Sequence, residues 1–154
     1  ELSDISLGFF LHDIGKIILN RQLQIESMNH GEIKECCSLL EFEEKLLNTN
    51  HVKVGVALLS KWGLPKSITA PIAQHHHPEI HKITDLGCKI VYLANCLVEG
   101  IGIRAIDPNS IFFSFEDCIE TENAPEVPGF SENMEEIISE FYEKFNQDRA
   151  FDSD

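Results

Sequence analysis

The chain has 154 residues, of which 43% are hydrophobic, and a formal net charge of −14 at pH 7. This length predicts one domain, and no apolar stretch approaches the roughly 20 residues that span a bilayer. So large an excess of acid repels phosphate backbones, which argues against a DNA-binding protein. The N-terminus has no basic segment ahead of an apolar one, so we expect no signal peptide, no membrane association and a cytoplasmic location.

Five cysteines occur without a Cys-x-x-Cys pair, which indicates reduced thiols and no disulfide framework. Cys88 and Cys96 lie on one predicted helix, and we interpret both as core residues.

Apolar residues at helical spacing predict a first helix over residues 4–19, with Gly15 weakening its last turn. Because the chain opens without Met just before this helix, we interpret the chain as a fragment, or the second half, of a longer domain, without the upstream helices of that domain. Residues 20–30 are polar and give no firm element, and residues 31–47 predict one or two short helices.

The central part of the chain carries the clearest helix signals. Residues 48–50 form a cap signal before a helix over 51–62, which Gly63 ends as its C′ residue. Pro65 starts a helix that runs to about His76, before Pro78.

A further helical face covers residues 83–97, and residues 103–130 are rich in loop signals. Ser131 caps a last helix with Ile137 among its inward residues and glutamates outward, and residues 148–154 are expected to fray. Without a convincing strand ladder, the predicted fold class is all-α, as one domain over residues 1–154.

The histidines gather in a pattern that suggests metal chemistry. His12 precedes Asp13, His51 opens the strong helix, and His75 begins a run of three histidines. Imidazole and carboxylate together suit zinc, iron, manganese, cobalt or nickel. Lys16 lies one turn after His12, where it could hold a phosphate oxygen.

Structural explanations compete with this one. A His-Asp dipeptide alone is not specific, and histidines near a helix end can interact with the last carbonyls and the helix dipole. His30 and His81 have no such setting, and we interpret both as surface residues.

Three segments together resemble a known family. Residues 11–16, Leu-His-Asp-Ile-Gly-Lys, resemble the signature of HD-superfamily phosphohydrolases. Residues 50–65 and 68–78 resemble the HDOD branch of that superfamily, in the family's order and with plausible spacing. The resemblance covers roughly residues 5–98 and implies a multi-helical HD-domain-like bundle.

The resemblance also implies roles for individual residues. His12 and Asp13 match the first-metal ligands, and Asp13 can bridge to a second metal. The residues that match second-metal ligands are His51, His75 and His76. Lys16 matches the lysine that approaches a substrate phosphate, so Asp13 and Lys16 are the predicted catalytic residues.

Two departures from the family pattern bear on activity. Asn95 occupies the position of the family's last aspartate ligand, and a neutral amide is a poorer ligand for a metal. The family's first histidine ligand precedes the His-Asp pair, and residues 1–5 cannot supply it.

Three interpretations remain open. The first is an HDOD-type regulatory or signal-transduction domain of a bacterial pathway, with a signalling protein as partner. The second is a metal-dependent phosphohydrolase that acts on a nucleotide or cyclic dinucleotide, a phosphate-containing small molecule. The third is a helical scaffold whose histidines bind nothing.

Overall fold

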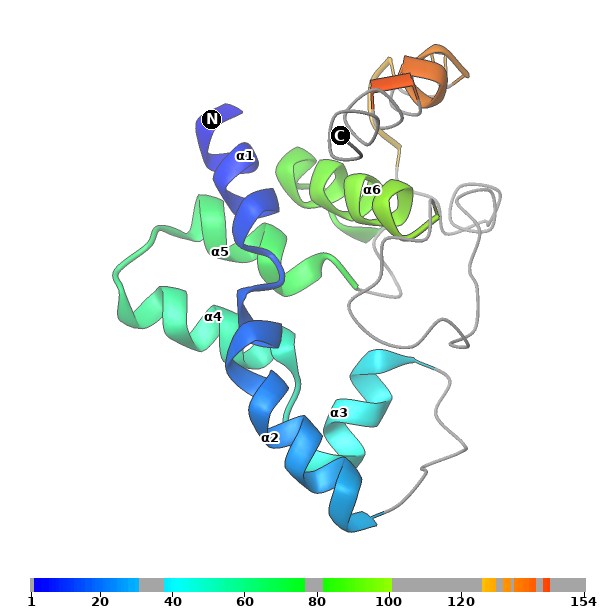
Figure 1. Ribbon diagram of the computed structural model, residues 1–154. Coiled ribbons are helices and arrows are strands. Elements are labelled where there is room, and N and C mark those ends of the chain that lie inside the picture. Colours follow the sequence, from blue (N-terminus) through cyan, green and yellow to red (C-terminus); the bar gives the residue numbers. More distant parts are fainter. Residues whose placement is uncertain are drawn as a thin grey trace, which may run out of the picture.

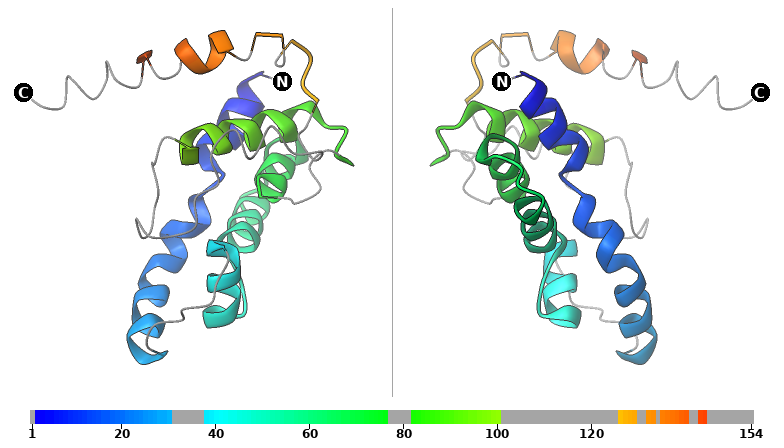
Figure 2. Two further views of the ribbon diagram at one scale, coloured as in Figure 1. Left: turned by 90° about the vertical axis from the view of Figure 1, so that its right-hand side faces the viewer. Right: turned by 90° about the vertical axis from the view of Figure 1, so that its left-hand side faces the viewer.

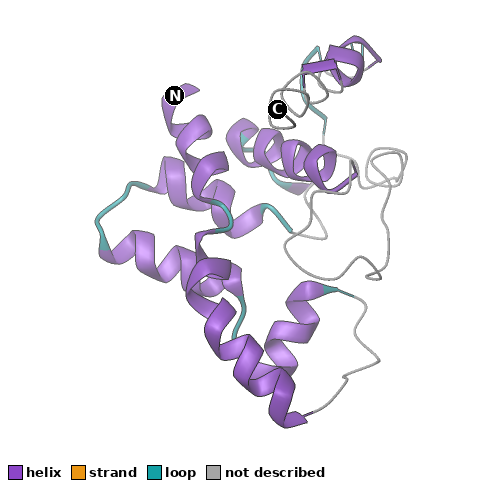
Figure 3. Ribbon diagram, viewed as in Figure 1, coloured by secondary structure: helices purple, strands orange, loops and turns teal. Residues whose placement is uncertain are grey.

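The computed structural model describes residues 2–30, 38–76 and 82–100, together with 126–129, 132–133, 135–140 and 143–144. These residues are arranged in α-helices without a strand, as Figures 1 and 3 show, which confirms the all-α prediction for this part of the chain. The helices are α1 (Leu2–Leu11), α2 (Ile14–His30), α3 (Leu39–Leu47), α4 (His51–Lys61), α5 (Lys66–Gln74) and α6 (Leu86–Gly100).

The helices form two rows closed at one end by α6. Helices α1 and α2 follow each other along one side, and α3, α4 and α5 lie along the other in the two side views of Figure 2. Helix α1 packs against α5 and α6, and α2 packs against α3 and α4. The junction between α1 and α2 therefore lies close to the places where α4 begins and α5 ends (Figure 1).

A small core holds this junction in place. Leu59 of α4 and Ile68 and Ile72 of α5 are buried together. Leu11 and Ile14, on either side of the junction, pack against them from α1 and α2. An exposed hydrogen bond of 2.7 Å from Ser67 Oγ to Asp4 Oδ2 adds a polar contact between α5 and α1.

The predicted first helix over residues 4–19 is wrong as a single element. Helix α1 ends at Leu11, His12 and Asp13 form a turn, and α2 begins at Ile14 and continues to His30. The polar residues 20–30 are therefore helical, with Leu23 buried among them. The apolar spacing passes through the break without interruption, so only tertiary contacts distinguish the two helices.

The central helix signals are confirmed. Asn50 caps α4 by accepting a hydrogen bond of 2.9 Å from the Lys53 amide, and Gly63 follows with a φ of +78°. Helix α5 begins after Pro65, although it ends at Gln74, two residues earlier than predicted. Helix α6 covers most of the predicted face, with Cys88 and Cys96 buried as expected.

At the C-terminal end, residues 135–140 are helical, but Ile137 is 37% exposed, so its predicted inward position is wrong. The predictions for residues 103–125, Ser131, His81, the tail 148–154 and the side chain of His30 lie outside the described residues. Among the helices described, none combines the length and hydropathy needed to cross a membrane.

Candidate metal centre

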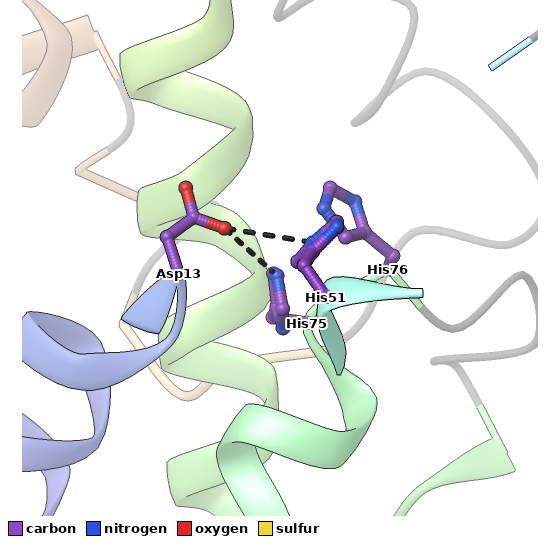
Figure 4. A group of neighbouring side chains, drawn as sticks. All are labelled: Asp13, His51, His75 and His76. Atoms are coloured by element: carbon purple, nitrogen blue, oxygen red, sulfur yellow. Dashed lines mark ion pairs between the residues drawn. The ribbon is translucent and has the colours of Figure 1, made fainter. Parts of the chain in front are cut away.

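Four of the predicted site residues come together where three chain segments meet. Asp13 lies in the turn between α1 and α2, His51 is the first residue of α4, and His75 and His76 directly follow α5. Each offers one ligand atom, and these atoms lie within 4.8 Å of one another. Figure 4 shows the Asp13 carboxylate directed at His51 and His75, with the His76 ring beside that of His51.

A close backbone approach permits this arrangement. A Cβ atom on Gly15 would lie 1.9 Å from the His51 carbonyl oxygen, so the start of α2 touches the start of α4. On α4, Gly55 faces the same contact, since a Cβ there would lie 3.5 Å from the Gly15 nitrogen. The two glycines let α2 approach α4 closely enough for Asp13 to face His51.

The hydrogen bonds of two histidines fix which ring nitrogen carries a lone pair. His51 Nδ1 lies 2.7 Å from Glu43 Oε2, and His75 Nδ1 lies 2.6 Å from the Ile72 carbonyl oxygen. A carboxylate or carbonyl oxygen can only accept, so both Nδ1 atoms donate. Both Nε2 atoms are thereby left as acceptors, in the tautomer that binds a metal.

The ligand atoms face one another without a donor between them. Asp13 Oδ1 lies 3.5 Å from His51 Nε2 and 3.6 Å from His75 Nε2. These three atoms and His76 Nε2 are buried and have no hydrogen-bond partner. Buried polar atoms are normally paired, and lone pairs that converge in this way are repulsive unless a cation lies between them.

The spacing also suits one ion. Ligand atoms about 2.1 Å from a tetrahedral metal ion are about 3.4 Å from one another. The distances of 3.5 and 3.6 Å from Asp13 Oδ1 to the two Nε2 atoms match this spacing. Small side-chain shifts would bring the whole cluster, whose atoms lie within 4.8 Å of one another, to the same spacing. The residues present therefore fit a single divalent metal ion.

The second carboxylate oxygen of Asp13 has different neighbours. Lys16 Nζ lies 2.7 Å from Oδ2, and His12 Nε2 lies 3.3 Å from the same atom. The Nδ1 atom of His12 bonds the Phe9 carbonyl oxygen, which orients its ring toward Asp13. Asp13 thus directs one oxygen at the histidine cluster and the other at two basic side chains.

The pKa shifts separate His12 from His75 and His76. Burial lowers the pKa of His75. Burial also lowers the pKa of His76, and repulsion from the nearby basic groups His75, His51 and Lys16 lowers it further, to about 2. At neutral pH these rings are uncharged and can donate lone pairs. Burial also opposes a charged His12, but its hydrogen bond to Asp13 and the Asp13 charge outweigh burial and raise its pKa.

Asp13 is ionised despite its surroundings. Burial alone would raise the pKa of this carboxyl, but the hydrogen bond from His12 and the Lys16 charge hold it well below its usual range. An anionic oxygen beside neutral imidazoles is the donor set that a divalent cation requires.

Two further residues, His12 and Asn95, were also predicted as ligands. His12 contacts Asp13 and stacks edge-on against His75 at 4.9 Å between ring centres, but it is not among the four clustered residues. Asn95 is a buried residue of α6, 4% exposed. Its role as a ligand stays a prediction.

Glu43 is a site residue that the sequence analysis missed. Its side chain is fully buried and its Oε2 accepts from both the backbone N–H and the Nδ1–H of His51. Its neighbours Glu41 and Glu44 are also acidic, and a group of acidic residues on a helix is usually a solvated face. The available signal was its spacing, since Glu43 lies four residues from both Leu39 and Leu47 on the apolar stripe of α3.

Fold and cluster together define an all-helical domain with a candidate centre for one divalent metal ion. Residues 3–78 match the model of the HDOD domain, a family that is related to the HD superfamily. The matched segment contains all four clustered residues, whereas Asn95 and the rest of α6 lie beyond it. No curated protein and no solved structure matches the chain.

Proposed function

We propose that this chain is an HDOD-type regulatory domain that binds one divalent transition-metal ion through Asp13, His51, His75 and His76. The observation that carries the proposal is the set of four buried acceptor atoms that converge without a donor. A structure that only used these histidines as scaffold would leave their lone pairs unsatisfied, at a cost of about 1–3 kcal/mol for each such group. We expect the third interpretation, an inert scaffold, to fail for this reason.

The number of ligands favours regulation over catalysis. A catalytic zinc usually has three protein ligands and an open position for water, whereas four protein ligands close a tetrahedral site. Asp13 and the three histidines make four. Lys16 supports the same conclusion, because its ammonium group is engaged by Asp13 at 2.7 Å and its side chain is 17% exposed.

The second candidate is a metal-dependent phosphohydrolase, and one observation favours it. The Asp13 side chain is 35% exposed, so the carboxylate edge of the cluster is open to solvent beside Lys16. An octahedral ion such as Mn²⁺ would keep positions for water or a phosphate oxygen there. When bound, such an ion would polarise a phosphoryl oxygen and lower the pKa of a coordinated water.

Metal analysis and zinc titration of the purified protein test the regulatory proposal. We expect about one ion per chain, and we expect His76→Ala to abolish uptake. The matched control is His12→Gln, which alters a neighbouring histidine outside the four-residue group and should retain the ion. Absence of uptake by the wild-type protein would refute the proposal.

A phosphodiesterase assay with added Mn²⁺ or Fe²⁺ separates the two candidates. The regulatory proposal predicts no turnover of a generic diester or of cyclic dinucleotides. Turnover that Asp13→Asn removes and that a change outside the site such as Glu41→Gln leaves intact would establish the phosphohydrolase instead.

A further inference from the structure

We propose that Glu43 is the positioning residue of the ion site. Glu43 holds His51 in place as a ligand and links the docking of α3 to occupancy of the site. This inference rests on the proposed ion binding, but its first step concerns the protein without an ion. Glu43 belongs to none of the motifs that resemble the family, and it lies on a different helix from every candidate ligand.

The first step is the double contact between Glu43 and His51. The Oε2 atom of Glu43 accepts from the His51 backbone N–H at 2.8 Å and from its Nδ1–H at 2.7 Å. Both side chains are fully buried. Two bonds from one acceptor atom to one residue determine both the start of α4 and the rotation of the imidazole ring.

The second step is the tautomer. With the proton on Nε2, the Nδ1 lone pair would face a carboxylate oxygen at 2.7 Å in a site without solvent, which is strongly unfavourable. Glu43 therefore keeps the proton on Nδ1 and directs the Nε2 lone pair at Asp13 Oδ1, 3.5 Å away. A carboxylate behind a ligating histidine also makes that histidine a stronger donor to a metal.

The third step links the site to α3. Among the described elements α3 packs mainly on α2, and hydrogen bonds join it to the start of α4. Besides Glu43, Glu44 Oε1 bonds Asn50 Nδ2 and Lys53 Nζ, both at 2.6 Å. An ion at His51 Nε2 withdraws electron density from the ring, so Nδ1–H becomes a better donor to Glu43 and α3 is held more firmly. By thermodynamic linkage, the factor by which α3 docking improves ion affinity equals the factor by which the ion improves docking.

Nitrogen NMR of the His51 ring in metal-free protein tests the positioning role. We expect the wild-type ring to carry its proton on Nδ1, and we expect Glu43→Gln to retain this tautomer, because an amide oxygen can still accept both bonds. In Glu43→Ala we expect a mixture of tautomers. Glu41→Gln, on the same helix and half-exposed, is the matched control and should leave the ring unchanged.

Zinc affinity, measured by competition with a chromophoric chelator, tests the effect on the ion. Loss of such a supporting carboxylate typically weakens metal affinity by about 10- to 100-fold. We expect a loss of about tenfold in Glu43→Gln, a larger loss in Glu43→Ala, and less than a twofold change in Glu41→Gln. Because Glu43→Gln keeps the shape of the side chain, it decides the question if Glu43→Ala does not fold.

Hydrogen exchange of α3 amides with and without zinc tests the link. We expect zinc to slow exchange in residues 39–47 of the wild-type protein, and to do so less in Glu43→Gln. Wild-type zinc affinity in both Glu43 variants, or a wild-type ring protonated on Nε2, would overturn the positioning role. Equal slowing in Glu43→Gln would overturn the link. If the wild-type protein takes up no zinc, the ion site itself is refuted, while the tautomer measurement still decides whether Glu43 positions the ring.

Discussion

Replacing Gly15 by alanine tests the contact that brings Asp13 to the histidines. The new Cβ would lie 1.9 Å from the His51 carbonyl oxygen and 2.9 Å from its Cα, and real Cβ contacts shorter than 3.0 Å essentially never occur. These are backbone atoms that cannot rotate away, so α2 and α4 would have to separate by about 1 Å. Overpacking of this kind costs about 1–3 kcal/mol. Alanine regains about 1 kcal/mol through its helix propensity, which leaves a net loss of up to about 2 kcal/mol.

The matched control is Gly8→Ala on α1. Its Cβ would meet the Ile68 carbonyl oxygen at 3.4 Å and the Pro71 Cβ at 3.5 Å, which are ordinary contacts. We expect this variant to be as stable as the wild-type protein or more stable by up to about 1 kcal/mol. Denaturant unfolding gives the two free energies, and zinc titration should show at least about a tenfold weaker affinity in Gly15→Ala only, because site geometry tolerates about 0.5 Å. If Gly15→Ala matches Gly8→Ala in both measurements, the reasoning is refuted.

Three further predictions concern pH, capping and thiol reactivity. The pKa values of His75 and His76 are lowered in the folded, metal-free protein. Below about pH 6.5 the unfolded chain therefore binds more protons than the folded protein, and the free energy of unfolding should fall as the pH falls. The free energy of unfolding should change by at most about 1.4 kcal/mol per pH unit for each histidine. The raised pKa of His12 offsets part of this change. A pH series of denaturant midpoints that is flat or rises toward acid would contradict the prediction. Asn50→Ala removes the cap of α4 and should cost about 1 kcal/mol in denaturant unfolding, whereas Asn50→Ser should retain most of it; equal losses would exclude capping as the cause. Burial, with Asp85 beside it, raises the pKa of the Cys88 thiol to about 12, so alkylation of Cys88, followed by peptide mass spectrometry, should require unfolding, and rapid labelling of the native protein would contradict its burial.

Local sequence signals predicted the elements whose ends are set by local contacts. Helix α4 is an example, because the Asn50 side chain caps its first turn and Gly63 supplies the positive φ after its last. Both features depend on residue types a few positions apart, so they can be recognised without knowledge of the rest of the fold.

The break between α1 and α2 could not be predicted in the same way. The apolar spacing continues through His12 and Asp13, and no proline marks the interruption. Adjacent positions of one helix point about 100° apart, and the turn instead leaves Asp13 free to face α4 and α5. The turn lies beside the contact between Gly15 and His51, which joins residues 36 positions apart in the chain and has no local sequence signal.

The candidate ligands of the site could be predicted from sequence motifs, but Glu43, which supports His51, could not. His51, His75 and Asp13 belong to recognisable motifs, and the structure brings them together with His76. Glu43 has no motif, and an acidic residue on a helix is usually solvated. Its burial arises only when α3 meets the start of α4, which no local pattern encodes.

The wide separation of the ligands along the chain has a kinetic consequence. Asp13, His51 and the pair at 75–76 can meet only after three segments have docked, so we expect the complete site to form late in folding. An interaction absent from the transition state slows unfolding without accelerating folding. In stopped-flow experiments zinc should therefore leave the refolding rate unchanged and prolong the lifetime of the native protein.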